Sequence, residues 1–131
     1  MRSHRLLNAE HGSAAIETVF AIVLLVVLTL GAVQVAFALY ARNVVASAAH
    51  EGVRAAVERG ATGADAVDVV AAVVERAAGG LVDDLRVDVT SATRGPRTVL
   101  TVHVRGATAV FGPVPVALPL SAEATSVTET P

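Results

Sequence analysis

Uncharged and largely apolar residues run without a break from Thr18 to Ala41, close to the start of the chain. At about 1.5 Å of rise per residue, a helix over this run is roughly 36 Å long. Because the hydrocarbon core of a bilayer is roughly 30 Å thick, such a helix crosses it with some tilt. Arg42 ends the run. We therefore predict a basic leader over residues 1–12 and a single transmembrane helix over residues 13–41.

The helical spacing of apolar residues continues beyond Arg42. Small and apolar residues recur every three or four positions, as on the inner face of an amphipathic helix, at Val45, Ala48, Ala49, Gly52 and Ala56. Polar and charged residues take the opposite side, at Asn43, Ser47, His50, Glu51, Arg54 and Glu58. Gly60 is the first strong helix stop. The pattern predicts that the same helix continues outside the membrane over residues 42–59.

Residues 60–131 are predicted to form a small extracytoplasmic domain. It begins with a second amphipathic helix over Ala64–Ala78, which a Gly-Gly pair ends and whose expected apolar stripe is Val67, Val70, Ala71, Val74 and Ala78. The apolar period then changes to two. Apolar residues alternate with polar ones in two segments, as in half-buried strands, at Leu85, Val87 and Val89 and again at Leu100, Val102 and Val104.

A turn over residues 93–97 joins these two strands into a hairpin. The segment 112–119 has three prolines, which donate no ladder hydrogen bonds, so we expect a loop or a sheet edge there. Leu120–Val127 is expected to be the last strand. The fold class is therefore α+β: a long N-terminal transmembrane helix, a second helix, and an antiparallel sheet of three or four strands packed on the outer half of the first helix.

Composition excludes several classes of function. The net charge is −2 and the ten basic residues, all arginine, form no cluster, so nucleic acid is not an expected partner. The chain has no cysteine, which excludes disulfides and thiolate metal sites. The four histidines, His4, His11, His50 and His103, lack metal-ligand spacing, and no catalytic fingerprint is present. We expect neither an enzyme nor a cofactor or metal.

One carboxylate stands at the beginning of the apolar run. Glu17 follows Gly12 and four small or apolar residues, and a charge at such a position is costly to place in a membrane. This arrangement resembles the processing site of type IV pilin precursors. The resemblance implies that a membrane-embedded prepilin peptidase cuts after Gly12, that Ser13 becomes the new amino terminus, and that Glu17 serves assembly. Pairing Glu17 with the α-ammonium group of a neighbouring subunit removes two desolvation costs together.

The resemblance extends along the helix, because residues 12–57 are similar to the TadE-like family of tight-adherence pilus proteins. The residues that carry it after the membrane run are Tyr40, Arg42, Asn43, Glu51, Gly52 and Arg54, with His50 and Val53 as departures from the usual pattern. Membership implies a minor pilin or pseudopilin in the cell membrane, with a cytoplasmic amino terminus. Its implied partners are the prepilin peptidase, other pilin-like subunits, pilus-assembly membrane proteins and the lipid bilayer.

Two other interpretations stay open. In one, the chain is an unprocessed single-pass anchor, and Glu17 only reaches the membrane surface. In the other, residues 36–38 or 46–48 form a signal-peptidase site and release a secreted binding module. The apolar run is longer than the usual 7–15 residues of a signal peptide, which disfavours release. Arginines flank the run on both sides, so charge does not decide the orientation.

Overall fold

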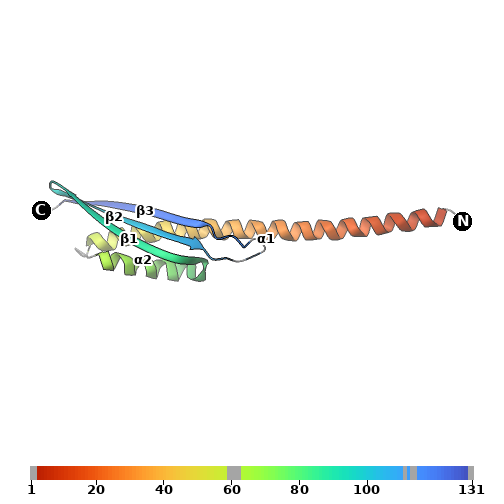
Figure 1. The fold of residues 1–131 in the computed structure, drawn as a ribbon, viewed down its shortest axis with the longest axis horizontal. Coiled ribbons are helices and arrows are strands. Elements are labelled where there is room, and N and C mark those ends of the chain that lie inside the picture. Colours follow the sequence, from red (N-terminus) through yellow and green to blue (C-terminus); the bar gives the residue numbers. More distant parts are fainter. Residues whose placement is uncertain (1–2, 59–62, 111, 113–114, 130–131) are drawn as a thin grey trace.

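The computed structural model describes residues 3–58, 63–110, 112 and 115–129, with residues 3–12 described by their backbone alone. It contains helix α1 (Ser3–Glu58), helix α2 (Gly63–Ala78), a short 3-10 turn η1 (Gly79–Leu81), and strands β1 (Val82–Arg94), β2 (Arg97–Thr108) and β3 (Pro119–Glu129). The amino-terminal half of α1 projects alone, and all other elements gather around its carboxyl-terminal half (Figure 1). The predicted α+β class is confirmed, with a three-stranded sheet in the described residues.

Helix α1 begins at Ser3, ten residues before the predicted start at Ser13. The prediction was wrong because a helix that is already nucleated extends at little cost, with one hydrogen bond gained for each residue added. No proline stands between Ser3 and Gly12 to prevent this extension. The described helix ends at Glu58, and the predicted helix end at residue 59 and stop at Gly60 lie outside the described residues.

The exposure of α1 changes abruptly along its length. Large apolar side chains are exposed in its first half, with Phe20 at 70% and Leu25 at 64%, whereas Ala41 is only 1% exposed. Ser13–Glu58 contains a stretch long and apolar enough to cross a membrane, and no residue of that stretch is buried by the rest of the protein. Burying apolar surface gains about 25 cal/mol per Å², so this segment favours an apolar environment. It fits a single-pass membrane protein.

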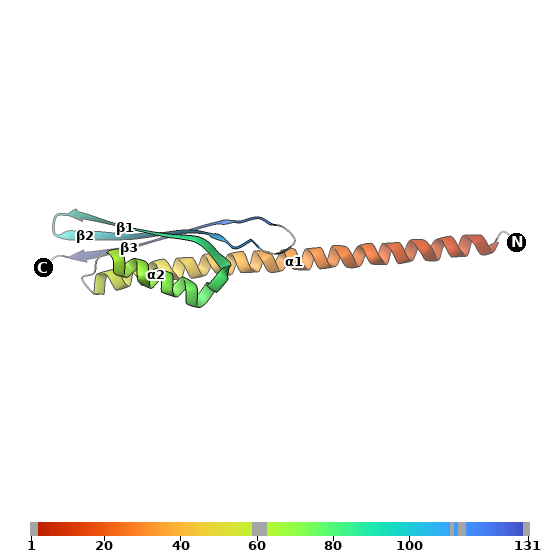
Figure 2. The ribbon, with the colours of Figure 1, turned by 60° about the horizontal axis from the view of Figure 1, so that its bottom comes forward.

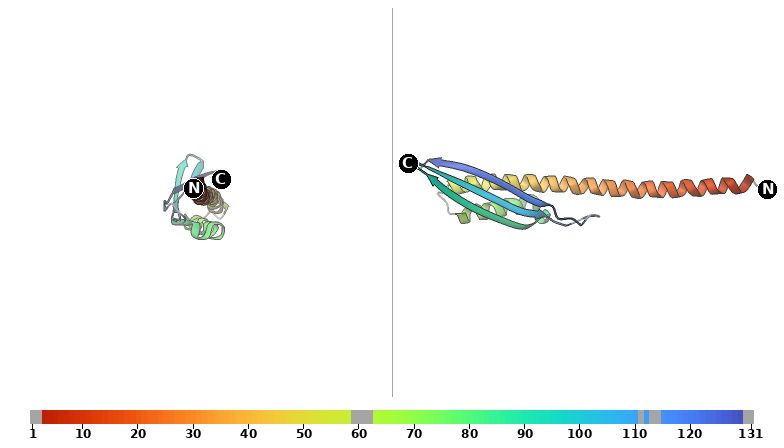
Figure 3. Two further views of the ribbon diagram at one scale, coloured as in Figure 1. Left: turned by 90° about the vertical axis from the view of Figure 1, so that its right-hand side faces the viewer. Right: turned by 45° about the horizontal axis from the view of Figure 1, so that its top comes forward.

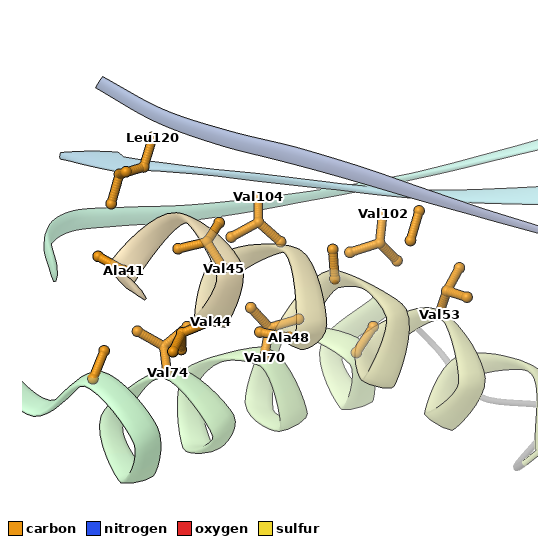
Figure 4. Close-up of a cluster of buried hydrophobic side chains, with 14 of the residues drawn as sticks. Ala41, Val44, Val45, Ala48, Val53, Val70, Val74, Val102, Val104 and Leu120 are labelled. Atoms are coloured by element: carbon orange, nitrogen blue, oxygen red, sulfur yellow. The ribbon is translucent and has the colours of Figure 1, made fainter. Parts of the chain in front are cut away.

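The carboxyl-terminal half of α1 lies between α2 on one side and the sheet on the other (Figures 2 and 3). The predicted inner face of α1 is confirmed, because Val45, Ala48, Ala49, Gly52 and Ala56 are all buried. Val70 and Val74 reach this face from α2, while Val102, Val104 and Leu120 reach it from the sheet (Figure 4). Small side chains on α1 let both layers approach closely, so the helix is itself the centre of the core.

The predicted apolar stripe of α2 is partly wrong. Val70, Val74 and Ala78 are buried as expected, but Val67 and Ala71 are exposed, and Ala66 is buried in their place. The buried residues form a single row spaced four apart, the ridge that fits into a groove of a neighbouring helix. Helix α2 therefore rests on α1 along a narrower line than its composition suggested.

The sheet is antiparallel with strand order β1-β2-β3, and its inner face follows the predicted alternation. Val102 pairs with Val89 on one side and with Ala124 on the other, so one row of side chains crosses all three strands. The strands are longer than predicted, and the β1–β2 connection is a tight turn at Gly95-Pro96 rather than residues 93–97. Gly95 has a φ of 63°, a conformation that glycine adopts without strain.

Candidate functional site

The predicted processing and assembly residues lie near the free end of α1. Gly12 and Ser13 are both within the helix, so the peptide bond between them is helical. Glu17 follows one turn later and is exposed. It is the one charged residue between Ser13 and Ala41. No ion pair to Glu17 occurs among the described residues.

The surface around Glu17 is a shallow hollow along one face of α1, lined by Ala14, Glu17, Thr18, Ala21, Ile22 and Leu25. The hydroxyl of Thr18 donates to the backbone carbonyl of Ala14 at 2.9 Å, and the hydroxyl of Thr29 donates to that of Leu25 at 2.8 Å. These hydroxyls are therefore satisfied within the helix. Glu17 is the charged residue among those that line this hollow.

The residues of the TadE-like element do not form one site. Arg42, Asn43, Glu51 and Arg54 are exposed, whereas Gly52 is buried. Arg54 pairs with Glu58, one helical turn away, at 3.8 Å, but both side chains are 68% exposed and such pairs contribute at most about 1 kcal/mol. No ion pair between Glu51 and Arg54 is found among the described residues.

Gly52 lies where α1 packs closely against α2. A Cβ atom at this position would lie 2.5 Å from Cγ2 of Val70 and 3.4 Å from the backbone oxygen of Ala66. Van der Waals contact between carbon atoms requires roughly 3.5–4.0 Å, so no other residue fits here unless the Val70 side chain or α2 shifts. The glycine of the element therefore has a packing role.

Tyr40 also docks α2. Its hydroxyl donates to the backbone carbonyl of Ala77 at 2.8 Å. Ala77 lies in the last turn of α2, where carbonyl groups have no partner within the helix. Tyr40 thus caps the carboxyl end of α2 from the place where α1 leaves the domain.

Tyr40→Phe is expected to lower the free energy of unfolding by about 0.5–1.5 kcal/mol, the usual net value of one hydrogen bond. Hydrogen exchange should quicken selectively in the last turn of α2. Urea unfolding in detergent micelles, together with exchange measured by mass spectrometry, tests this. Equal protection of that turn in both proteins would show that the hydroxyl does not hold it.

The outer face of the sheet carries a polar row that the sequence analysis did not predict. His103 lies between Asp88 of β1 and Glu123 of β3, and its Nδ1 is 3.4 Å from a carboxylate oxygen of Glu123. Strand register is needed to see this row, and spacing along the chain does not supply it. No group of three metal-ligating side chains is found among the described residues.

A second feature that the sequence analysis missed is the connection between β2 and β3. It reaches past the end of the sheet along α1, toward the projecting half of the helix (Figure 1). Gly112 lies against the side chain of Gln34, closely enough that a Cβ atom on Gly112 would collide with it. The available signal was the absence of any charged residue from Gly106 to Ala122.

Comparison with known proteins agrees with the resemblance carried by α1. Residues 12–54 match the model of a family described as TadE-like protein. This stretch contains Gly12, Glu17 and the whole Tyr40–Arg54 element. Searches of curated proteins and of solved structures found no match.

Proposed function

We propose, from the premise that this is a TadE-like protein associated with tight-adherence pili, that it is a minor pilin or pseudopilin. A prepilin peptidase cuts the precursor after Gly12, and α1 then carries the subunit from the membrane into the assembly. The leader lies in the cytoplasm and the α+β domain lies outside it. The observation that carries the proposal is Glu17, a carboxylate within the matched residues at the start of an exposed stretch of α1 that carries no other charge before Arg42.

The architecture supports assembly through α1. Its first half is exposed and apolar, so it exchanges lipid contacts for contacts with other helices without unfolding the domain. Its second half is the centre of the domain core, which couples the folded domain rigidly to the assembling helix. In this proposal the protein acts by binding other helices through the exposed surface of the first half of α1.

The core disfavours release as a secreted module. Cleavage after residue 48 would remove Ala41, Val44, Val45 and Ala48, all of them buried in the core. Cleavage after residue 38 would remove Gln34, against which Gly112 packs. A product that begins near Leu39 or Ala49 would therefore lose contacts that the domain uses.

Processing is tested by the mass and amino-terminal sequence of the protein extracted from membranes. We expect a product that begins at Ser13. A product that retains Met1 would instead support the unprocessed anchor, and a soluble product that begins near Leu39 or Ala49 would support secretion.

Gly12→Leu is expected to lower the processed fraction by about tenfold or more, because one poorly accommodated side chain costs a protease site on the order of 1–3 kcal/mol. Glycine also lets the helical turn at the cleaved bond unwind at about 1 kcal/mol less than alanine. Gly31→Leu is the matched control, since nothing lies within 4 Å of a Cβ at Gly31. Equal processing of both variants would exclude Gly12 as the cleavage position.

A further inference from the structure

The connection between β2 and β3 forms an apolar surface at one end of the domain. Three of its side chains are exposed, namely Val110 at 55%, Val116 at 55% and Leu118 at 46%. We call this the apolar loop and use only its described residues, 109, 110, 112 and 115–118. With no charge from Gly106 to Ala122, the loop has a composition suited to an apolar medium rather than to water.

The apolar loop lies at the level of the projecting half of α1. Between them is an apolar cavity of about 400 Å³, lined from α1 by Gly31, Gln34, Val35, Phe37 and Ala38, and from the domain by Leu81, Thr108, Ala109, Val116 and Leu118. Gln34 precedes Arg42, the end of the uncharged run, by eight residues or roughly 12 Å of helix. If α1 crosses a bilayer through that run, the loop lies at the level of the leaflet on the domain's side, near its boundary with the headgroups.

Backbone groups in lipid must find hydrogen-bond partners within the protein. At the neck of the loop, which we define as Thr108, Ala109 and Leu118, all three N–H groups have such partners. The Thr108 N–H donates to the carbonyl of Leu118 at 2.9 Å, and the Leu118 N–H donates to the hydroxyl of Thr108 at 2.9 Å. The Ala109 N–H donates to the carbonyl of Leu81 at 2.9 Å. Prolines along the segment further reduce the number of N–H donors.

We infer that the apolar loop is a second membrane contact, which enters the lipid leaflet on the domain's side and rests at the boundary between headgroups and acyl chains. The occupant of the cavity between the loop and α1 is a lipid acyl chain. Lipid is the expected occupant because the exposed apolar surface of the loop is continuous with that of α1, with no charged residue between them. The core of the leaflet is excluded because irregular backbone is not tolerated there.

This contact fixes the orientation of the domain relative to the membrane. A helix alone leaves the domain free to tilt and rotate, whereas two contacts on different elements hold it in one orientation. The inference requires only that α1 crosses a bilayer, so it holds equally for a processed pilin and for an unprocessed anchor.

The chain has no tryptophan, so single substitutions provide an unambiguous reporter. Val116→Trp places it on the loop, and Val127→Trp is the matched control on the outer face of β3, where Val127 is 58% exposed. Val110→Trp is a second loop reporter should Val116→Trp disturb folding. Full-length protein is reconstituted in phosphatidylcholine vesicles, with lipids brominated either high on the acyl chain or near its methyl end.

We expect blue-shifted emission from both loop reporters and a loss of emission with brominated lipid, larger for the shallow bromines than for the deep ones. Val127→Trp should emit as in water and keep its intensity. Loop reporters that are no more quenched than Val127→Trp would overturn the inference. Weak quenching of the loop reporters would overturn the inference at any emission wavelength. Emission as in water would indicate an exposed loop, and blue-shifted emission without quenching would indicate a loop covered by another copy of the protein. Because retention of residues 1–12 does not change these outcomes, failure here is distinct from failure of the proposed function.

Discussion

Replacing Gly52 by valine is expected to destabilise the folded domain by about 3 kcal/mol, the upper end of the usual cost of overpacking a core. A single Cβ would already lie 2.5 Å from Cγ2 of Val70, and valine adds two further carbons. The backbone oxygen of Ala66 is already in contact, 3.4 Å from the same point, and leaves little room for these carbons on that side. We therefore expect Val70 or helix α2 to shift away from α1, so that the buried row Ala66–Val70–Val74 loses contact with it.

The competing effect is helix propensity. Valine is a better helix former than glycine by less than about 1 kcal/mol, which offsets only part of the clash. Gly31→Val measures this term alone, because a Cβ at Gly31 has nothing within 4 Å. Thermal unfolding in detergent, followed by circular dichroism, should show a lower midpoint for Gly52→Val by roughly 10–20 °C. A midpoint equal to that of Gly31→Val would mean that the domain accommodates the valine at position 52 without losing stability.

The parts of the fold that periodicity determines were predicted correctly. The inner face of α1 and the alternation of β1 and β2 each follow from one repeating pattern of side chains. The buried stripe of α2 was only partly predicted. Helix α2 has two adjacent apolar rows, and the row that is buried is the one that fits the space left by Gly52 on α1. The start of α1 was missed because polar sequence near a helix end does not itself stop the helix.

The candidate site shows the same division. Gly12 and Glu17 are predicted from a local spacing, which needs no knowledge of the fold and which the structure does not test. The roles of Gly52 and Tyr40 were hidden, because their contacts, Val70 and Ala77, come from a different helix. The apolar loop was the hardest feature to predict from the sequence. Its position beside α1 depends on the hydrogen bonds between Thr108 and Leu118, which only the structure shows.

Under the proposed function, α1 has two separate tasks. The surface around Glu17 remains open to a partner, whereas the surface around Gly52 is filled by the protein's own domain. Substitutions at the two positions should therefore fail differently. Gly52→Val should reduce the amount of folded protein, and a change at Glu17 should leave the fold intact and affect assembly alone.

Glu17→Gln is expected to reduce incorporation into the pilus assembly by about a hundredfold or more, while folding, membrane insertion and processing continue. Glutamine keeps the shape of the side chain but removes its charge, so the α-ammonium group of a neighbouring Ser13 is left without a counter-ion at the membrane edge. Breaking a desolvated pair by removing one partner costs about 3–5 kcal/mol, and each 1.4 kcal/mol is a factor of ten in association.

Glu51→Gln is the matched control for the charge change, because Glu51 is exposed on the domain half of α1 and makes no ion pair among the described residues. Immunoblots of sheared filament fractions and of membrane fractions separate assembly from expression, and the mass of the membrane form verifies cleavage. Wild-type incorporation of Glu17→Gln would eliminate the charge pair as the driving contact. A processed, folded, membrane-bound Glu17→Gln that stays out of the filament fraction would place the assembly contact at the carboxylate, since its charge is the one property removed.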